Sequence, residues 1–158
     1  MSVQIAIQQL GDSIESAFPN SITLSDSSGV WVKPELIVEI CTYLKEDPGQ
    51  DYGLLNSLTA VDYIEFFDVV YHLTSLSHKK MAILKTRVYG RDNLSVPSVH
   101  TIWKGATLQE REVWDLLGIS FDGHPNLSRI LTWEGFQGHA LRRDYLEPPL
   151  PYTWPHGG

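Results

Sequence analysis

Six histidines and one cysteine are the first candidates for chemistry in this sequence of 158 residues. No two histidines have the i, i+4 spacing on a predicted helix that points two imidazoles at one metal ion. Cys41 alone cannot supply the set of about four Cys or His ligands that an iron–sulfur cluster or a structural zinc site takes. We therefore expect structural histidines and no metal or iron–sulfur cluster bound by this chain.

Motifs for nucleophilic and nucleotide chemistry are also missing. The sequence has no Gly-x-Ser-x-Gly, the motif that presents a serine nucleophile on a sharp turn. The loop Gly90 to Asn93 has one glycine, and loops that cradle phosphates have more. We predict no catalytic residue, and no nucleotide or flavin bound by this chain.

Charge and hydropathy exclude two classes of partner. The formal net charge of -7 argues against a nucleic-acid or anionic-lipid surface, because both need a basic footprint. No apolar run reaches the ~18 residues of a membrane span, and Met1 to Leu10 lacks the pattern of a signal peptide. We expect a soluble chain whose contact with a membrane is indirect.

The densest charged group is the stretch Glu110 to Gly118. Thr107 and Glu110 have the spacing of a capping box, in which each side chain binds a backbone amide at the helix start. This predicts a helix over 108–117, with Gly118 as its left-handed stop.

Arg111 and Asp115 are i, i+4 partners on that helix, and we predict an ion pair between them. An exposed pair of this kind stabilises a helix by roughly 0.3–0.5 kcal/mol. On physical grounds a capped surface helix is the simpler interpretation, and an interface element is the alternative.

Two amphipathic helices are predicted before residue 50. Apolar residues at three- and four-residue spacing define the first: Val3, Ile7, Leu10, Ile14 and Ala17. Pro19 stops this helix, and Pro34 suits the first position of the second. The buried face of the second would carry Leu36, Ile37, Ile40, Cys41 and Leu44. Cys41 is then a core residue rather than a reactive thiol.

From residue 52 to 89 the pattern favours β-structure. Strands are predicted over 67–76 and 81–89, joined by a polar hairpin connection over 77–80. Helices followed by strands indicate an α+β fold, with a mainly antiparallel sheet and helices packed on one face. We assign residues 1–118 to this domain.

Residues 119–158 are predicted to form a long extended tail. Four of the nine prolines lie in its last eleven residues, at 148, 149, 151 and 155. Its large aromatic residues are too apolar for a disordered linker: Trp133, Phe136, Tyr145, Tyr152 and Trp154. Such a tail either wraps its own domain or lies on another protein, and we favour the second. Arg129, Arg142 and Arg143 suit docking onto an acidic or carbonyl-rich protein surface.

The stretch Glu110 to Tyr145 resembles the signature of a known family. It has an E-R-E-x-x-D helix, a G-H-P-x-L turn followed by R-I-L, and a closing L-R-R-D-Y. These motifs resemble the C/J family of subunits in the complex I type NADH (or ferredoxin):quinone oxidoreductases. Ser128 stands where that family usually has a basic residue, and Ala140 where it usually has proline.

The resemblance implies a non-catalytic structural subunit in the hydrophilic arm of a proton-pumping oxidoreductase. Such a subunit docks on the quinone-site subunit, which resembles a NiFe-hydrogenase large subunit, while iron–sulfur clusters and the quinone site lie in partner subunits. It is peripheral to the membrane, on the cytoplasmic or the equivalent stromal or matrix side. The expected partner-interface residues are Glu110, Arg111, Glu112, Asp115, His124, Arg129, Arg142, Arg143, Asp144 and Tyr145.

Two other functions stay open. A homologous subunit of a membrane-bound NiFe-hydrogenase or formate hydrogenlyase shares this module, and its large subunit would carry four nickel-binding cysteines. An unrelated small enzyme is the second, and activity from the isolated chain would reveal it.

Overall fold

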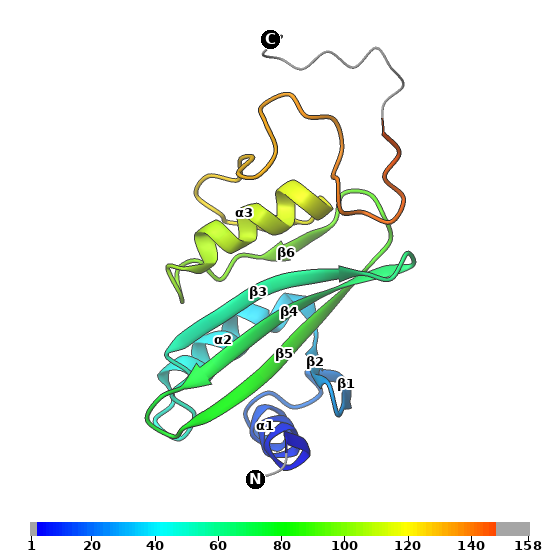
Figure 1. The fold of residues 1–158 in the computed structure, drawn as a ribbon. Coiled ribbons are helices and arrows are strands. Elements are labelled where there is room, and N and C mark those ends of the chain that lie inside the picture. The colour runs from blue at the N-terminus through cyan, green and yellow to red at the C-terminus, as the bar shows by residue number, and fades with distance from the viewer. Residues whose placement is uncertain (1–2, 148–158) are drawn as a thin grey trace.

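The computed structural model describes residues 3–147, which build an α+β fold around a five-stranded sheet (Figure 1). The sheet order is β1-β2-β5-β4-β3. Its strands are β1 (Ile22–Asp26), β2 (Gly29–Val32), β3 (Leu54–Asp62), β4 (Phe66–Ser75) and β5 (Lys80–Tyr89). All pairs are antiparallel except β2 with β5. The predicted mainly antiparallel sheet is confirmed.

The β4–β5 hairpin is the best-predicted part of the sheet. Alternate residues of β4 face the core, and Phe67, Tyr71 and Leu73 are fully buried there. Hydrophobic side chains at a spacing of two make one face of a strand apolar, which is why the pattern predicts the strand. The predicted strand bounds agree with the observed ones to within one residue.

The β1–β2 hairpin is a strand pair that the sequence did not predict. Most of β1 is exposed and β2 is buried throughout, so neither strand shows alternation. Gly29, the first residue of β2, has φ +149°, and a Cβ there would lie 2.8 Å from the carbonyl oxygen of Ile83. The close approach of β2 to β5 thus requires a glycine at this turn.

The helices lie on one face of the sheet, as expected. Helix α1 (Val3–Ala17) packs beside β1 and β5, and α3 (Ala106–Leu117) packs beside β3 (Figure 1). Side chains of both helices share one core cluster with α2 (Ile37–Glu46) and with the sheet. Cys41 of α2 is buried there, and burial raises the pKa of its thiol.

Three details of the helices differ from the prediction. Pro34 opens a short 3-10 turn, η1 (Pro34–Leu36), and the α-helix begins only at Ile37. Ala17, placed on the buried stripe of α1, is exposed. The capping box is wrong, because α3 begins at Ala106 after Gly105, with no side-chain cap. Gly118 does end α3 in the left-handed conformation, with φ +77°.

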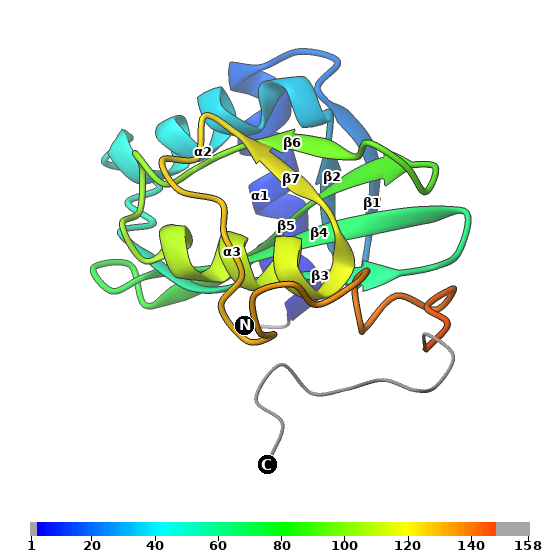
Figure 2. The ribbon, with the colours of Figure 1, turned by 90° about the horizontal axis from the view of Figure 1, so that it is seen from above.

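The folded domain extends beyond the expected boundary at residue 118. Strand β7 (Ser120–Asp122) returns from α3 and pairs in parallel with β6 (Ser95–Pro97) (Figure 2). Ile119 and Phe121 are buried in the common core. A three-residue strand is too short to show a period in the sequence, so the boundary was placed too early.

Residues 123–147, called here the C-terminal segment, contain no helix and no strand. The segment runs over α3 and then toward the end of the sheet where β3 turns into β4 (Figure 1). Among residues 3–147, no helix is long and apolar enough to cross a membrane.

Candidate partner interface

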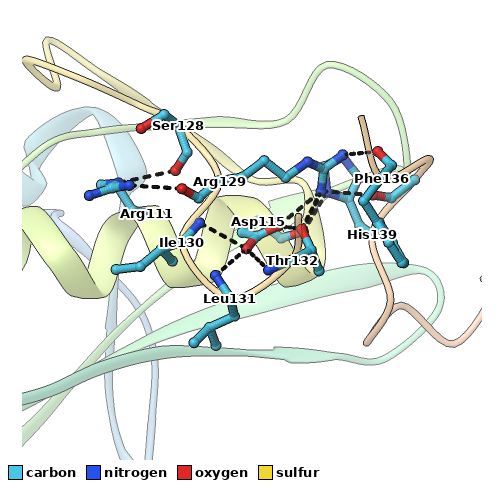
Figure 3. Close-up of polar contacts among 10 residues, drawn as sticks. Arg111, Asp115, Ser128, Arg129, Ile130, Leu131, Thr132, Phe136 and His139 are labelled. Carbon is cyan, nitrogen blue, oxygen red and sulfur yellow. Dashed lines mark hydrogen bonds and ion pairs between the residues drawn. The ribbon is translucent and has the colours of Figure 1, made fainter. Parts of the chain in front are cut away.

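Asp115 near the end of α3 organises the first half of the C-terminal segment (Figure 3). Its buried Oδ2 accepts hydrogen bonds from three consecutive amides, those of residues 130, 131 and 132, at 3.1, 2.8 and 2.9 Å. Its Oδ1 accepts from Thr132 Oγ1 and, at 2.9 Å, from Arg129 Nη1. Burial opposes ionisation, but these donors outweigh it and lower the pKa of Asp115 below its usual range.

Arg129 joins three parts of the chain. Its guanidinium donates to the carboxylate of Asp115, to the carbonyl of Phe136 at 2.8 Å and to that of Gly138 at 3.0 Å. The same group lies over the ring of Trp114, 5.5 Å from its centroid. A positive charge beside the last turn of α3 also favours the helix dipole.

The backbone carbonyls at the end of α3 have no partner within the helix, and they accept hydrogen bonds from the C-terminal segment. His139 Nδ1 lies 2.9 Å from the carbonyl of Asp115, and the amide of Leu141 donates to Leu116 at 3.0 Å. A Cβ at Gly118 would lie 2.6 Å from the His139 ring. Gly118 therefore serves both the left-handed turn and the close approach of this histidine.

The predicted ion pair between Arg111 and Asp115 is wrong. Arg111 donates instead to the carbonyls of Ser128 and Arg129, at 3.1 and 2.8 Å (Figure 3). The i, i+4 rule describes an exposed helix face, whereas here the C-terminal segment covers the helix and offers both residues closer partners.

Glu110 binds the chain that precedes α3. The carboxylate, fully buried, accepts from the amide of Val99 at 2.8 Å and from Ser98 Oγ at 2.5 Å. His124 Nε2 lies 3.9 Å away and faces the carbonyl of Thr107 at 2.9 Å. Burial raises the pKa of Glu110, opposed by these hydrogen bonds. Thr107 and Glu110 therefore have structural partners other than the expected cap.

Asp62 at the end of β3 organises the second half of the segment. Arg91 reaches both oxygens of its carboxylate, at 2.5 and 2.8 Å, and the amide of Arg143 donates to it at 2.9 Å. Hydrogen bonds from Arg91, together with those from backbone amides, lower the pKa of Asp62 to about 2 despite burial. Asp62 thereby ties β3 to the end of the described chain.

Asp144 extends this second network. It accepts from Arg91 at 2.7 Å and from Arg142 at 3.0 Å, and these two arginines lower its pKa. Arg142 also donates to the carbonyl of Arg91 at 2.7 Å. Tyr145 stacks on Phe136, with 5.9 Å between ring centroids.

These contacts divide the ten expected interface residues. Glu110 and Asp115 are fully buried and bind the chain's own backbone amides. Arg111, His124, Arg129 and Arg142 are largely engaged with the domain or the segment itself. Glu112, the Arg143 side chain and Asp144 are exposed, and Tyr145 is half-buried against Phe136. Residues 129–145 contact the chain's own domain, their contact with a partner stays a prediction, and residues 148–158 lie outside the described chain.

Asp62 and Arg91 are the main members of the site that the sequence did not predict. Arg91 lies in the loop that was considered only as a phosphate cradle. No local spacing links Asp62 to either Arg91 or Arg143, because the tertiary fold brings these residues together.

Among the described residues, no group of three or more His, Cys, Asp or Glu side chains is arranged to hold a metal ion. The imidazoles of His100 and His124 lie near each other, with 6.0 Å between ring centroids.

Large apolar side chains are exposed along the segment that the two carboxylates fix. Leu131, Leu141 and Leu146 are 63%, 62% and 87% exposed. Leu108 on α3 is exposed as well. The segment therefore has a defined backbone and an uncovered apolar surface.

Comparison with known proteins identifies the family. The family model described as "Respiratory-chain NADH dehydrogenase, 30 Kd subunit" matches residues 30–150. The chain is similar to the C subunit of the NADH-quinone oxidoreductase from Roseiflexus sp. (strain RS-1), 39% identical over 141 residues, which cover 87% of this chain and 80% of the relative. The corresponding protein of Roseiflexus castenholzii is 41% identical over 138 residues, covering 83% and 79%.

A solved structure shares the fold. It is a chain from the membrane-bound sulfane sulfur reductase, an archaeal respiratory membrane complex, with a TM-score of 0.62 and 24% identity. The match covers 84% of this chain and 79% of that one. Because the family model spans most of the sequence and the relatives are this similar, the protein belongs to the family of the 30 kDa subunit of respiratory-chain NADH dehydrogenase, which includes the C subunits of NADH-quinone oxidoreductases.

Proposed function

We propose that this chain is a non-catalytic scaffold subunit that docks on the quinone-site subunit of a proton-pumping NADH (or ferredoxin):quinone oxidoreductase. Family membership makes it a subunit of a complex I type oxidoreductase. The names of its relatives favour this enzyme over a NiFe-hydrogenase or a formate hydrogenlyase.

The exposed leucines of the C-terminal segment carry the proposal. Single exposed leucines are common on protein surfaces, but Leu131 and Leu141 stand on a fixed backbone. The amide of Leu131 donates to the buried Asp115 carboxylate, and that of Leu141 donates to the carbonyl of Leu116. A segment that is ordered before binding loses little conformational entropy when a partner covers it. The exposed Arg143 adds a guanidinium that can bind carboxylates or carbonyls of the partner.

In this proposal the redox centres belong to other subunits. The chain itself binds no metal, flavin or nucleotide, and the iron–sulfur clusters and quinone site lie in its partners. It sits on the cytoplasmic side of the membrane, or the equivalent side in an organelle, and touches the membrane only through the complex.

The test is assembly of the complex with a tagged full-length chain as the only copy in the cell. Leu131→Asp and Leu141→Asp place a charge in the proposed interface and should lower recovery of the quinone-site subunit about tenfold or more, as 1.4 kcal/mol of lost affinity would. Leu76→Asp is the matched control, because Leu76 is 75% exposed on the distant β4–β5 turn. Recovery at the wild-type level with both segment variants would contradict the proposal.

A further inference from the structure

The turn between β3 and β4 contains a strained apolar residue. The amide of Tyr63 donates to the carbonyl of Phe66 at 2.9 Å and closes a turn around Ile64 and Glu65. Ile64 has φ +75°, the left-handed conformation. For a β-branched residue this costs about 1–3 kcal/mol, whereas glycine or asparagine adopts it readily.

Polar contacts offset the strain at Ile64. Its amide donates to Asp62 Oδ1 at 2.7 Å, and its carbonyl accepts from Arg91 Nη1 at 3.0 Å. The same Asp62 binds the amide of Arg143 in the C-terminal segment. The turn is thus held in a costly conformation while the Ile64 side chain remains 57% exposed.

Three aromatic side chains lie at this end of the hairpin, packed on one another. Tyr63 stacks on Phe66 with 5.0 Å between centroids, and Tyr89 lies 5.8 Å from Phe66. The Arg87 guanidinium covers the Phe66 ring at 3.7 Å. Tyr63 and Tyr89 are 47% and 72% exposed. Together Tyr63, Ile64, Phe66 and Tyr89 form the aromatic tip, a rigid apolar projection of the kind that dominates binding energy at interfaces.

We propose that the aromatic tip inserts into an apolar pocket with a basic rim on the same subunit that covers the C-terminal segment. The inference rests on the proposed function. Its contact surface is continuous with that segment, because Asp62 binds both Ile64 and Arg143. In two views at right angles, the hairpin end and the final described residues lie on the same side of the molecule (Figures 1 and 2).

The acidic residues beside the aromatic tip indicate the charge of the surface that it would bind. Glu65 and Asp92 are exposed next to Ile64 and Arg91, and a basic rim on the pocket would complement these two carboxylates. A second copy of this chain would bring the same acidic residues face to face, in a chain of net charge -7. A different, basic-rimmed protein fits the tip better than a copy.

The test measures association and stability in the same variants. Ile64→Asn suits the left-handed turn and removes the apolar side chain. We expect a thermal midpoint equal to or above that of the wild type, with about tenfold weaker binding to the quinone-site subunit of the same genome, co-expressed with the full-length chain. Tyr89→Ser should also weaken binding, and it leaves the sequence of the β3–β4 turn unchanged. Leu76→Asn, at the opposite end of β4, is the matched control and should bind normally.

The outcomes separate this inference from the proposed function. If Ile64→Asn and Tyr89→Ser bind normally while Leu131→Asp does not, the proposed role of the aromatic tip is overturned and the proposed function stands. Failure of the wild-type chain to bind the quinone-site protein overturns both. A lower thermal midpoint for Ile64→Asn with normal binding by Tyr89→Ser would show a purely structural turn. A wild-type dimer that Ile64→Asn abolishes in sedimentation would assign the tip to a second copy and overturn the proposal.

Discussion

Asp115 and Asp62 fix the same irregular segment, but they differ in the groups that they bind. Asp115 receives three consecutive amides and one guanidinium from a short stretch that directly covers its own helix. Asp62 receives the amides of Ile64 and Arg143, which are far apart in the chain, and a two-pronged contact from Arg91.

The surroundings of the two carboxylates differ as well. The Asp115 side chain is fully buried, while the Asp62 network continues into Asp144, whose side chain is 48% exposed. A buried carboxylate surrounded by amides depends on the folded backbone around it, whereas ion pairs to an exposed carboxylate such as that of Asp144 are weakened by salt and acid. The first half of the segment is therefore anchored to the core through Asp115, and the second half is an attachment that solvent conditions can loosen.

The largest expected effect comes from Asp115→Ala. This change leaves Arg129 without its carboxylate and three amides without an acceptor, which should lower the free energy of unfolding by about 3–5 kcal/mol. Denaturant titration gives the value, and limited proteolysis should show cleavage within residues 129–139. Glu112→Ala on the exposed face of α3 is the control and should change stability by less than about 0.5 kcal/mol. Equal stability of the two variants would remove the distinction between the halves.

An acid titration tests the second carboxylate. The pKa of Asp62 is lowered to about 2, so its contribution to stability is present above the ordinary carboxyl value near 4 and is lost as pH falls toward 2. The loss should be about 2 kcal/mol in this window, at 1.36 kcal/mol per unit of pKa. Hydrogen exchange should show residues 141–145 opening before residues 130–132.

Asp62→Asn is the matched variant for that titration. It should flatten the stability curve between pH 4 and pH 2 while the Asp115 region keeps its protection from exchange. Asp115 also has a lowered pKa, so it adds to the acid dependence of both proteins. Simultaneous opening of both halves in the wild-type protein would indicate one cooperative network instead of two.

The smallest expected signal is a coupling energy close to zero. A double-mutant cycle between Arg129 and Asp115 should give about 2 kcal/mol or more, because their side chains form a 2.9 Å ion pair with the carboxylate buried. The same cycle between Arg111 and Asp115 should give less than about 0.5 kcal/mol, since Arg111 binds carbonyls instead. A large coupling energy between Arg111 and Asp115 would indicate that they form the ion pair predicted from helical spacing.

The sequence by itself determined the elements that have an apolar face. Helix α1, helix α2 and the β4–β5 hairpin follow from the spacing of buried residues such as Leu10, Ile40 and Tyr71. Gly118 was also predictable, because few other residues adopt its left-handed conformation. The family motifs in residues 110–145 gave the complex I resemblance that the comparisons confirm.

Only the tertiary structure decided the partners of the charged residues. Spacing along one helix suggested Arg111 for Asp115 and a cap for Glu110, but covering segments brought Arg129, Val99 and Ser98 closer. The spacing of apolar residues indicates which face of a helix or strand is buried. This spacing involves residues that are close together in the chain, so it can be recognised from the local sequence. A buried carboxylate binds whichever donors the fold brings to it, and for Asp62 these come from three separate parts of the chain.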